Sequence, residues 1–151
     1  MTGNLEGGVL AARARRRATD WRDAVHQACA PLLEADTITD QYPRRCVEMV
    51  EEHGPYIVLA PGLALAHARP EDGVRRLGVA VITLTEPVSF GHADNDPVDV
   101  VFAFGSPDAD QHVGLLSSLA QHLVAGLADR LRLAADDHEA QQILEEIRDD
   151  D

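Results

Sequence analysis

Residues 54–70 read GPYIVLAPGLALAHARP, an apolar run that ends in a histidine and an arginine. From position 63 onward one parity holds Leu63, Leu65, His67 and Arg69, and the other parity holds alanines. Side chains two positions apart on an extended chain point to the same face, about 7 Å apart along the backbone. We therefore expect a short strand that places His67 beside Arg69 at the edge of an apolar floor. An imidazole next to a guanidinium is suited to carrying a phosphoryl group on nitrogen.

Apolar patterns on both sides of this run predict an α/β fold. Helical spacing predicts helices over residues 20–34, 40–53, 108–127 and 136–147. Short apolar runs predict buried strands over residues 57–60, 77–84 and 98–104, with a further extended piece that ends at His67. Two helices, several strands and two more helices together favour a mixed β-sheet flanked by helices on both faces.

The chain of 151 residues fits a single domain with a substantial core. Residues 1–18 differ from the rest, because they carry four arginines against one glutamate and lack apolar periodicity. We expect a disordered basic leader over residues 1–18 and one domain over residues 19–151.

The composition excludes several classes of function. The chain contains no lysine, so its 13 lysine-or-arginine positions are all arginines. A Walker A loop and Schiff-base or pyridoxal-phosphate chemistry each need a lysine and are therefore excluded. The net charge of -13 argues against nucleic acid or an anionic membrane surface as a partner. No apolar run approaches the roughly 20 residues of a spanning helix and no export signal is evident, so we expect a cytoplasmic protein without membrane insertion.

The sequence also gives no indication of cysteine or metal chemistry. Cys29 and Cys46 match no metal-binding or redox spacing, so we expect two reduced, buried side chains. A metal site built from His67, His92 and His112 would need distant segments to converge. We predict no metal and no other cofactor.

His112 is the second histidine that the pattern singles out. Helical spacing aligns it with Leu116, Leu119 and Leu123, which predicts that it lies on the buried face in the first turn of its helix. A helix N-terminus offers free backbone N–H donors and a positive potential, and both favour a bound phosphoryl group and a neutral imidazole. A neutral His112 can donate a hydrogen bond to a phosphoryl oxygen on His67. The alternative is a histidine that only completes the start of its helix.

The stretch around His67 resembles the phosphorylation-site segment of a known family, the enzyme IIA components of the bacterial phosphoenolpyruvate-dependent sugar phosphotransferase system, mannitol/fructose class. It is most similar to the ascorbate-type branch of that class. The segments that carry the resemblance follow in the family's order and are residues 20–24, 31–33, 51–56, 86–91, 96–98 and 107–112. A lone His-Ala-Arg would be a weak signal, whereas this ordered set is specific.

The resemblance implies a mixed sheet with helices on both faces and a phosphohistidine carrier that uses no nucleotide or metal. His67 matches the phosphorylated histidine of the family, and His112 matches its second active-site histidine. In such systems the phosphoryl group arrives from the carrier protein HPr and leaves for a cysteine of a IIB component, which serves the uptake of a sugar or an ascorbate-like substrate. Arg69 is a candidate for stabilising the phosphoryl group, and the alternative for it is a solvated surface charge.

Two other functions stay open at the level of sequence. One is a regulatory module of the same fold, whose phosphorylation on His67 controls its binding to another protein, as in nitrogen-type IIA relatives. The other is a binding domain that is never phosphorylated. Position 66 also departs from the family, because it is an alanine where proline is common, and this leaves the backbone before His67 less constrained.

Overall fold

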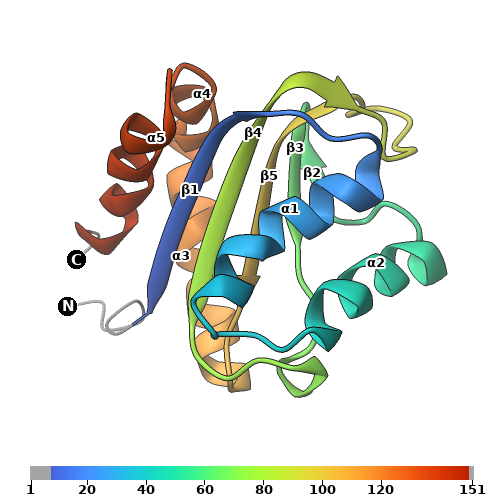
Figure 1. Ribbon diagram of the computed structural model, residues 1–151, viewed down its shortest axis with the longest axis vertical. Coiled ribbons are helices and arrows are strands. Elements are labelled where there is room, and N and C mark those ends of the chain that lie inside the picture. Colours follow the sequence, from blue (N-terminus) through green and yellow to red (C-terminus); the bar gives the residue numbers. More distant parts are fainter. Residues whose placement is uncertain (1–7, 150–151) are drawn as a thin grey trace.

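A five-stranded mixed β-sheet forms the centre of the molecule (Figure 1). The computed structural model describes residues 8–149, with the side chains of residues 109, 111, 112, 148 and 149 outside the description. The strands are β1 (Val9–Arg16), β2 (Val58–Ala60), β3 (Leu63–Ala66), β4 (Gly78–Val88) and β5 (Val98–Gly105). They follow the order β1-β4-β5-β3-β2, in which β1 with β4 and β3 with β5 are parallel, and the other two neighbouring pairs are antiparallel.

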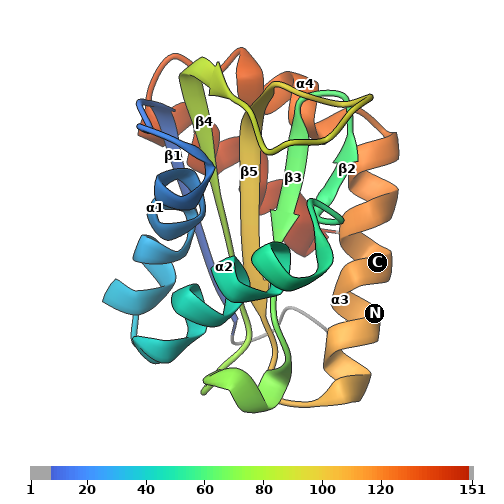
Figure 2. The ribbon, with the colours of Figure 1, turned by 90° about the vertical axis from the view of Figure 1, so that its right-hand side faces the viewer.

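Helices cover both faces of this sheet, as Figures 1 and 2 show. On one face lie α1 (Trp21–Glu34) and α2 (Gln41–His53), and on the other lie α3 (Ala109–Val124), α4 (Leu127–Arg132) and α5 (Asp137–Leu144). Two short 3-10 helices, η1 (Pro70–Asp72) and η2 (Glu145–Asp149), follow β3 and α5. The predicted α/β class, a mixed sheet flanked by helices on both faces, is therefore confirmed.

The alternation of β3 divides the core into two layers. Its alanines, Ala64 and Ala66, belong to the apolar cluster formed with α1 and α2. Its leucines, Leu63 and Leu65, belong to the cluster under α3, α4 and α5. Because a strand buried on both faces cannot slip by one residue without exchanging the two sets of side chains, the register of β3 is firmly set. This register determines where His67 stands at the end of the strand.

β1 is a strand that the sequence analysis missed. Its residues pair in parallel with β4 and form one edge of the sheet. Leu10, Ala12 and Ala14 are buried in the layer under α3, α4 and α5, and they alternate with positions that are only partly buried. The segment therefore has the period-two pattern of a strand that is buried on one face.

The arginines of β1 explain why this strand resembles a basic tail. They reach the surface, where Arg13 forms an ion pair with Glu34 and Arg16 forms one with Asp137. The expectation of a disordered leader over residues 1–18 is wrong for residues 9–16. Residues 1–7 lie outside the described part of the chain.

The outer edge of β1 is closed by side chains of α5 instead of by another strand. Gln141 accepts a hydrogen bond from the amide of Ala12 and donates one to the carbonyl oxygen of Leu10, both at 2.8 Å. Asp137 Oδ1 accepts from the amide of Ala14, also at 2.8 Å. These contacts satisfy backbone groups that an edge strand would otherwise present to solvent or to another chain.

Two predicted boundaries shift in the structure. The helix predicted over residues 108–127 ends at Val124, and α4 begins after Gly126, whose φ of 101° is left-handed. Glycine adopts this conformation without the steric cost that a side chain would bring. β4 continues beyond its predicted end at residue 84, through Pro87 to Val88.

Candidate functional site

The chain segment after β3 carries the predicted site. The ladder between β3 and β5 ends at Ala66, so His67 is the first residue beyond it. Ala68 is buried in the α1/α2 layer, whereas His67 is half-buried and Arg69 is exposed. The amide of Arg69 donates to Asp72 Oδ2 at 3.0 Å, which holds the start of η1. The alternation of the strand thus extends past its last hydrogen-bonded pair and leaves His67 accessible.

Among the described side chains and backbone groups, three neighbours hold the ring of His67. It stacks on the ring of Phe104 with 5.3 Å between the centroids and 28° between the planes. The ring of Tyr56 meets it edge-on, at 5.8 Å and 84°. His67 Nδ1 lies 3.1 Å from the carbonyl oxygen of Leu65. Because a carbonyl oxygen can only accept, this hydrogen bond requires the proton on Nδ1 and leaves the lone pair of the neutral ring on Nε2.

His67 borders a surface hollow of ≈ 340 Å³. The residues that line it with His67 are Met49, His53, Tyr56, Ala68, Arg69 and Pro70. Most of this lining is apolar, and Arg69 contributes a guanidinium to it. His67 and Arg69, which the sequence places on one parity, therefore border one hollow that is open to solvent.

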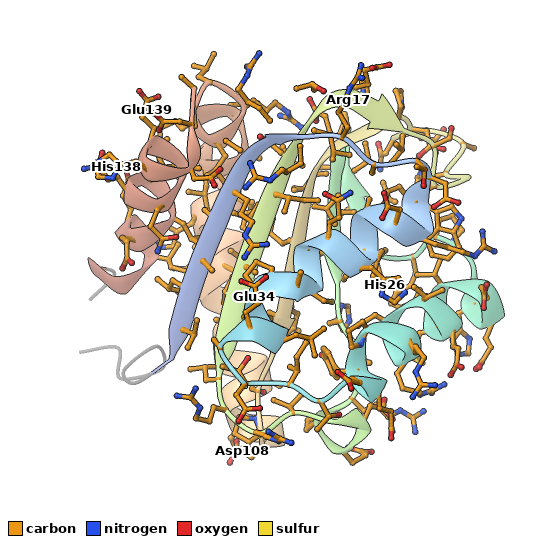
Figure 3. The ribbon with its side chains drawn as sticks, viewed as in Figure 1. Arg17, His26, Glu34, Asp108, His138 and Glu139 are labelled. Atoms are coloured by element: carbon orange, nitrogen blue, oxygen red, sulfur yellow. The ribbon has the colours of Figure 1, made fainter. Side chains whose placement is uncertain are left out.

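His112 lies at the same end of the sheet by its place in the chain. β5 ends at Gly105, α3 begins at Ala109, and the backbone of His112 is in the first turn of that helix. Figure 3 labels Asp108 at this end of the molecule and Arg17 at the opposite end. The side chain of His112 is outside the described part of the structure, so its predicted contact with His67 stays a prediction.

The buried face of α3 is centred differently from the predicted stripe. Leu115 and Leu119 are fully buried, whereas Leu116 and Leu123 are only partly buried against the same cluster. The prediction was right for Leu119 and wrong about the centre of the stripe, because a stripe at i, i+4, i+7 and i+11 fits two adjacent faces nearly equally well.

Tyr42 and Phe104 are site residues that the sequence analysis did not single out. Tyr42 lies in the first turn of α2, and its hydroxyl accepts from the amide of Ala68 at 2.9 Å and donates to the carbonyl oxygen of Phe104 at 2.8 Å. Burial and, to a lesser extent, the Cys46 thiol raise the pKa of Tyr42, so its hydroxyl keeps its proton at physiological pH. Apolar spacing alone marks both aromatic residues as core, which they are, and gives no sign of these contacts.

The polar loop between β4 and β5 is folded around its own side chains. His92 Nδ1 accepts from the amides of Asp94 and Asn95, at 3.2 and 3.1 Å. The carboxylate of Asp96 accepts from the amides of Phe90, Gly91 and His92, at 3.0, 2.7 and 3.0 Å. Burial acts to raise the pKa of Asp96, but these hydrogen bonds outweigh it and hold the pKa below its usual value. His92, the residue of this loop that was considered as a metal ligand, therefore shapes the loop itself, together with Asp96.

The two cysteines are free and buried, as predicted. They belong to the layer of α1 and α2, and the contact with the Cys29 thiol, together with burial, raises the pKa of Cys46. A thiol in such surroundings is a poor nucleophile.

None of the helices within residues 8–149 is long and apolar enough to cross a membrane.

The comparisons with known sequences all point to the same family. The model of the family described as "Phosphoenolpyruvate-dependent sugar phosphotransferase system, EIIA 2" matches residues 12–147. The ascorbate-specific PTS system EIIA component of Shigella boydii serotype 4 is 38% identical to this chain over 135 residues, which are 88% of each chain. The protein of the same name from Escherichia coli K12 is 36% identical over the same share of both chains.

Comparison with solved structures agrees. The mannitol-specific cryptic phosphotransferase enzyme IIA of Escherichia coli is similar with a TM-score of 0.81 and 28% identity, over 90% of this chain and 92% of that one. The enzyme IIA in the Escherichia coli complex of mannitol enzyme IIA with phosphorylated enzyme IIB has a TM-score of 0.75 over 89% and 93% of the two chains, and its identity of 20% shows a shared fold only. The chain therefore belongs to the EIIA 2 family of the phosphoenolpyruvate-dependent sugar phosphotransferase system, and it is a phosphotransferase component of that system.

Proposed function

We propose that this EIIA component accepts a phosphoryl group from phospho-HPr on Nε2 of His67 and passes it to a cysteine of a IIB component. The observation that carries the proposal is the hydrogen bond from His67 Nδ1 to the carbonyl oxygen of Leu65, because it presents Nε2 as the nucleophilic nitrogen of a half-exposed ring. A neutral imidazole nitrogen attacks phosphorus without the help of a strong base.

Neither of the two transfers requires a nucleotide or a metal ion, because each forms one bond to phosphorus and breaks one. In the first, the lone pair of His67 Nε2 forms a bond to phosphorus while the phosphorus–nitrogen bond of the donor histidine breaks and its electron pair returns to the donor ring. In the second, a IIB thiolate attacks phosphorus and the electron pair of the breaking bond returns to Nε2. Throughout, the proton stays on Nδ1 and is donated in a hydrogen bond to the Leu65 carbonyl oxygen, which stabilises the positive charge of the phosphorylated ring.

The surroundings of His67 suit such a carrier. Stacking on Phe104 limits the rotation of the ring, so that Nε2 stays in one position for in-line attack. Arg69 borders the same hollow and supplies a guanidinium for the phosphoryl oxygens. We assign His112 as the second active-site histidine, donating a hydrogen bond to the transferred group from the first turn of α3.

The names of the relatives suggest the pathway of the phosphoryl group. Curated relatives at 36% and 38% identity are ascorbate-specific EIIA components, and a structural neighbour was solved in complex with a phosphorylated IIB. We infer that the chain serves the uptake of a sugar or an ascorbate-like substrate and works in the cytoplasm. The net charge of -13 supports protein partners over nucleic acid or direct membrane insertion.

The proposal is tested by incubating the protein with phosphoenolpyruvate, enzyme I and HPr and then mapping the acid-labile phosphate. We expect labelling on His67, its complete loss in His67→Ala, and unchanged labelling in His92→Ala, whose ring belongs to the β4–β5 loop. His112→Ala should fold normally and label more slowly. Absence of label on the wild-type protein, or label that persists in His67→Ala, would contradict the proposal.

A second assay separates transport from regulation. Phosphorylated protein is mixed with the IIB component of the same system, and the label is followed to its cysteine. Transfer at a rate comparable to that of loading is the expected result. Stable phosphohistidine that no IIB cysteine can discharge would instead favour the regulatory alternative.

A further inference from the structure

A buried hydroxyl lies directly behind the proposed site. Tyr42 Oη is 2.9 Å from the amide nitrogen of Ala68 and 2.8 Å from the carbonyl oxygen of Phe104, with a longer approach of 3.4 Å to the carbonyl oxygen of Ala68. Since the hydroxyl has one proton, it accepts from Ala68 and donates to the nearer carbonyl, that of Phe104. One side chain therefore joins the residue after His67 to the residue on which the His67 ring stacks.

The hydroxyl sits where the next rung of the β3–β5 ladder belongs. The amide of Leu65 donates to Ile57 on the far side of β3, so the alternate amides, those of Ala64, Ala66 and Ala68, face β5. The ladder pairs Ala66 with Ala103, and the next pair in this register is His67 with Phe104. In a parallel ladder the bond for that pair runs from the amide of Ala68 to the carbonyl of Phe104. Tyr42 is inserted into this bond.

The chain makes room for the inserted side chain at Gly105. A Cβ atom there would lie 2.9 Å from Val74 Cγ2 and 3.5 Å from Tyr42 Cζ, so the end of β5 carries no side chain where the phenol ring enters. Tyr42 itself has a relative exposure of 0%. The ring is thus held on all sides, and the position of its hydroxyl is determined by packing.

Other contacts from α2 and from the residues just before it hold the same loop. The amide of Thr39 donates to the carbonyl oxygen of Gly73 at 2.8 Å, and Arg45 Nε approaches Asp72 Oδ1 at 3.4 Å. Asp72 in turn accepts from the amide of Arg69. The segment that follows His67 is therefore anchored to α2 at several points, and the Tyr42 hydroxyl is the anchor nearest to the histidine.

We propose that Tyr42 is a positioning residue for phosphoryl transfer: its hydroxyl replaces one rung of the β3–β5 ladder and thereby sets the backbone of His67 relative to Phe104. This inference rests on the proposed function, because it names the group that aims the acceptor ring. Without the hydroxyl, the amide of Ala68 either closes directly onto Phe104 or loses the partner it has here. In both cases the His67 ring moves relative to the stacking surface and to Leu65.

The first test is the kinetics of Tyr42→Phe, which removes the hydroxyl and keeps the ring. We expect kcat for loading from phospho-HPr to fall about ten- to a hundredfold, since displacement of a reacting group by about 1 Å can cost a hundredfold. KM for phospho-HPr should change less than about twofold, because the docking surface is untouched. Val47→Ala is the matched control, since Val47 lies in the same helix and the same apolar layer and its truncation lowers stability alone.

The second test reads the His67 ring directly, in protein that has never been phosphorylated. In ¹⁵N-histidine-labelled wild type we expect the ring nitrogen shifts of a tautomer with the proton on Nδ1. Tyr42→Phe should change these shifts and Val47→Ala should not. A residue that only stabilises the fold would move neither the ring shifts nor kcat.

The outcomes are separable. If Tyr42→Phe loses stability but keeps the ring shifts and kcat of the wild type, the positioning role is refuted. If the wild type is never phosphorylated, the proposed function fails, while the ring shifts still decide how Tyr42 acts on His67. Should Tyr42→Phe not fold, the wild-type protein provides the test. The NMR signal of the buried Tyr42 hydroxyl proton must then shift when His67 is phosphorylated, and an unchanged signal would overturn the inference.

Discussion

At the scale of single residues, Asp137 links the first strand to the last helix. Its carboxylate accepts from both terminal nitrogens of Arg16, at 3.0 and 2.8 Å, and from the amide of Ala14. The hydrogen bonds from Arg16 have the largest effect and hold the pKa of Asp137 below its usual value; burial opposes them, and the hydrogen bond from Ala14 adds to the lowering. A carboxyl whose pKa is lowered by folding stabilises the protein when ionised and loses that contribution when it is protonated.

We predict that Asp137→Asn lowers the free energy of unfolding at pH 7 by less than about 1 kcal/mol, because both partners are partly exposed. The difference from wild type should be constant above the ordinary carboxyl pKa of about 4 and vanish as the pH falls through the lowered pKa of the folded state. Urea titrations at several pH values between 6 and 3 measure it. In an Arg16→Gln background the pH dependence should shrink. A difference that grows toward acid pH would contradict the assignment.

Residues of the site divide by how far their partners lie along the chain. The proximity of His67 and Arg69 was predictable, because a two-residue alternation is a local pattern, and the structure places both on one hollow. The tie of Tyr42 to Ala68 and to Phe104 spans 26 and 62 positions, so no local pattern could indicate it. The tautomer of His67 was equally hidden, since it depends on how the ring turns back onto its own strand.

At the scale of elements, α5 acts as a substitute for a sixth strand. Gln141 donates to and accepts from the backbone of β1, as a neighbouring strand would. We predict that Gln141→Ala destabilises the protein by about 1–2 kcal/mol, because it leaves partly buried backbone groups without this partner. Gln142→Ala, the same change at the adjacent exposed position, should have almost no effect. Urea denaturation of the two variants measures the difference, and equal losses would argue against the edge role of Gln141.

Loss of the Gln141 side chain should also change the rate at which amide hydrogens of β1 exchange with solvent. Hydrogen exchange of the Ala12 amide should be faster in Gln141→Ala than in Gln142→Ala, because that amide loses its acceptor. If exchange at Ala12 were equal in both variants, the loss of stability would have to come from another contact.

The elements were predictable where a single physical signal dominated. The first two helices and the central strands have strong apolar periodicity, and the structure contains them within a few residues of the predicted bounds. The strand β1 was missed because its arginines suggested a solvated tail, whereas their ion pairs with Glu34 and Asp137 form only in the folded protein. The break between α3 and α4 was missed because the left-handed conformation of Gly126 depends on the packing of the helices around it.

At the scale of the whole molecule, the site draws on both helical layers. The segment after β3 is anchored to α2 on one face of the sheet, while Phe104 belongs to the core of the other face and leads through β5 into α3. The open hollow lies between the end of α2 and the segment after β3. This arrangement leaves His67 at an open surface, as the proposed transfers between proteins require, while its ring is held against Phe104.

The charge of the molecule should affect how fast partners arrive more than how the site reacts. With a net charge of -13, we expect phospho-HPr to approach with a basic face and kcat/KM for loading to fall about two- to tenfold between low salt and physiological ionic strength. The kcat should stay constant, because it reports the docked complex, in which the partner and not the salt solution faces His67. Stopped-flow or quench-flow loading assays at several salt concentrations measure both.

Two charge-neutralising variants test whether the attraction depends on carboxylates near His67 or on the net charge of the whole molecule. Glu52 is exposed at the end of α2, next to His53 at the hollow, so Glu52→Gln should lower kcat/KM at low salt and weaken its salt dependence. Asp94→Asn makes the same charge change in the β4–β5 loop, whose neighbour Asn95 contacts Gly62 at the other end of β3, and it should leave both unchanged. If the two variants behaved alike, attraction would come from net charge alone, and a rate independent of salt in the wild type would rule out electrostatic steering.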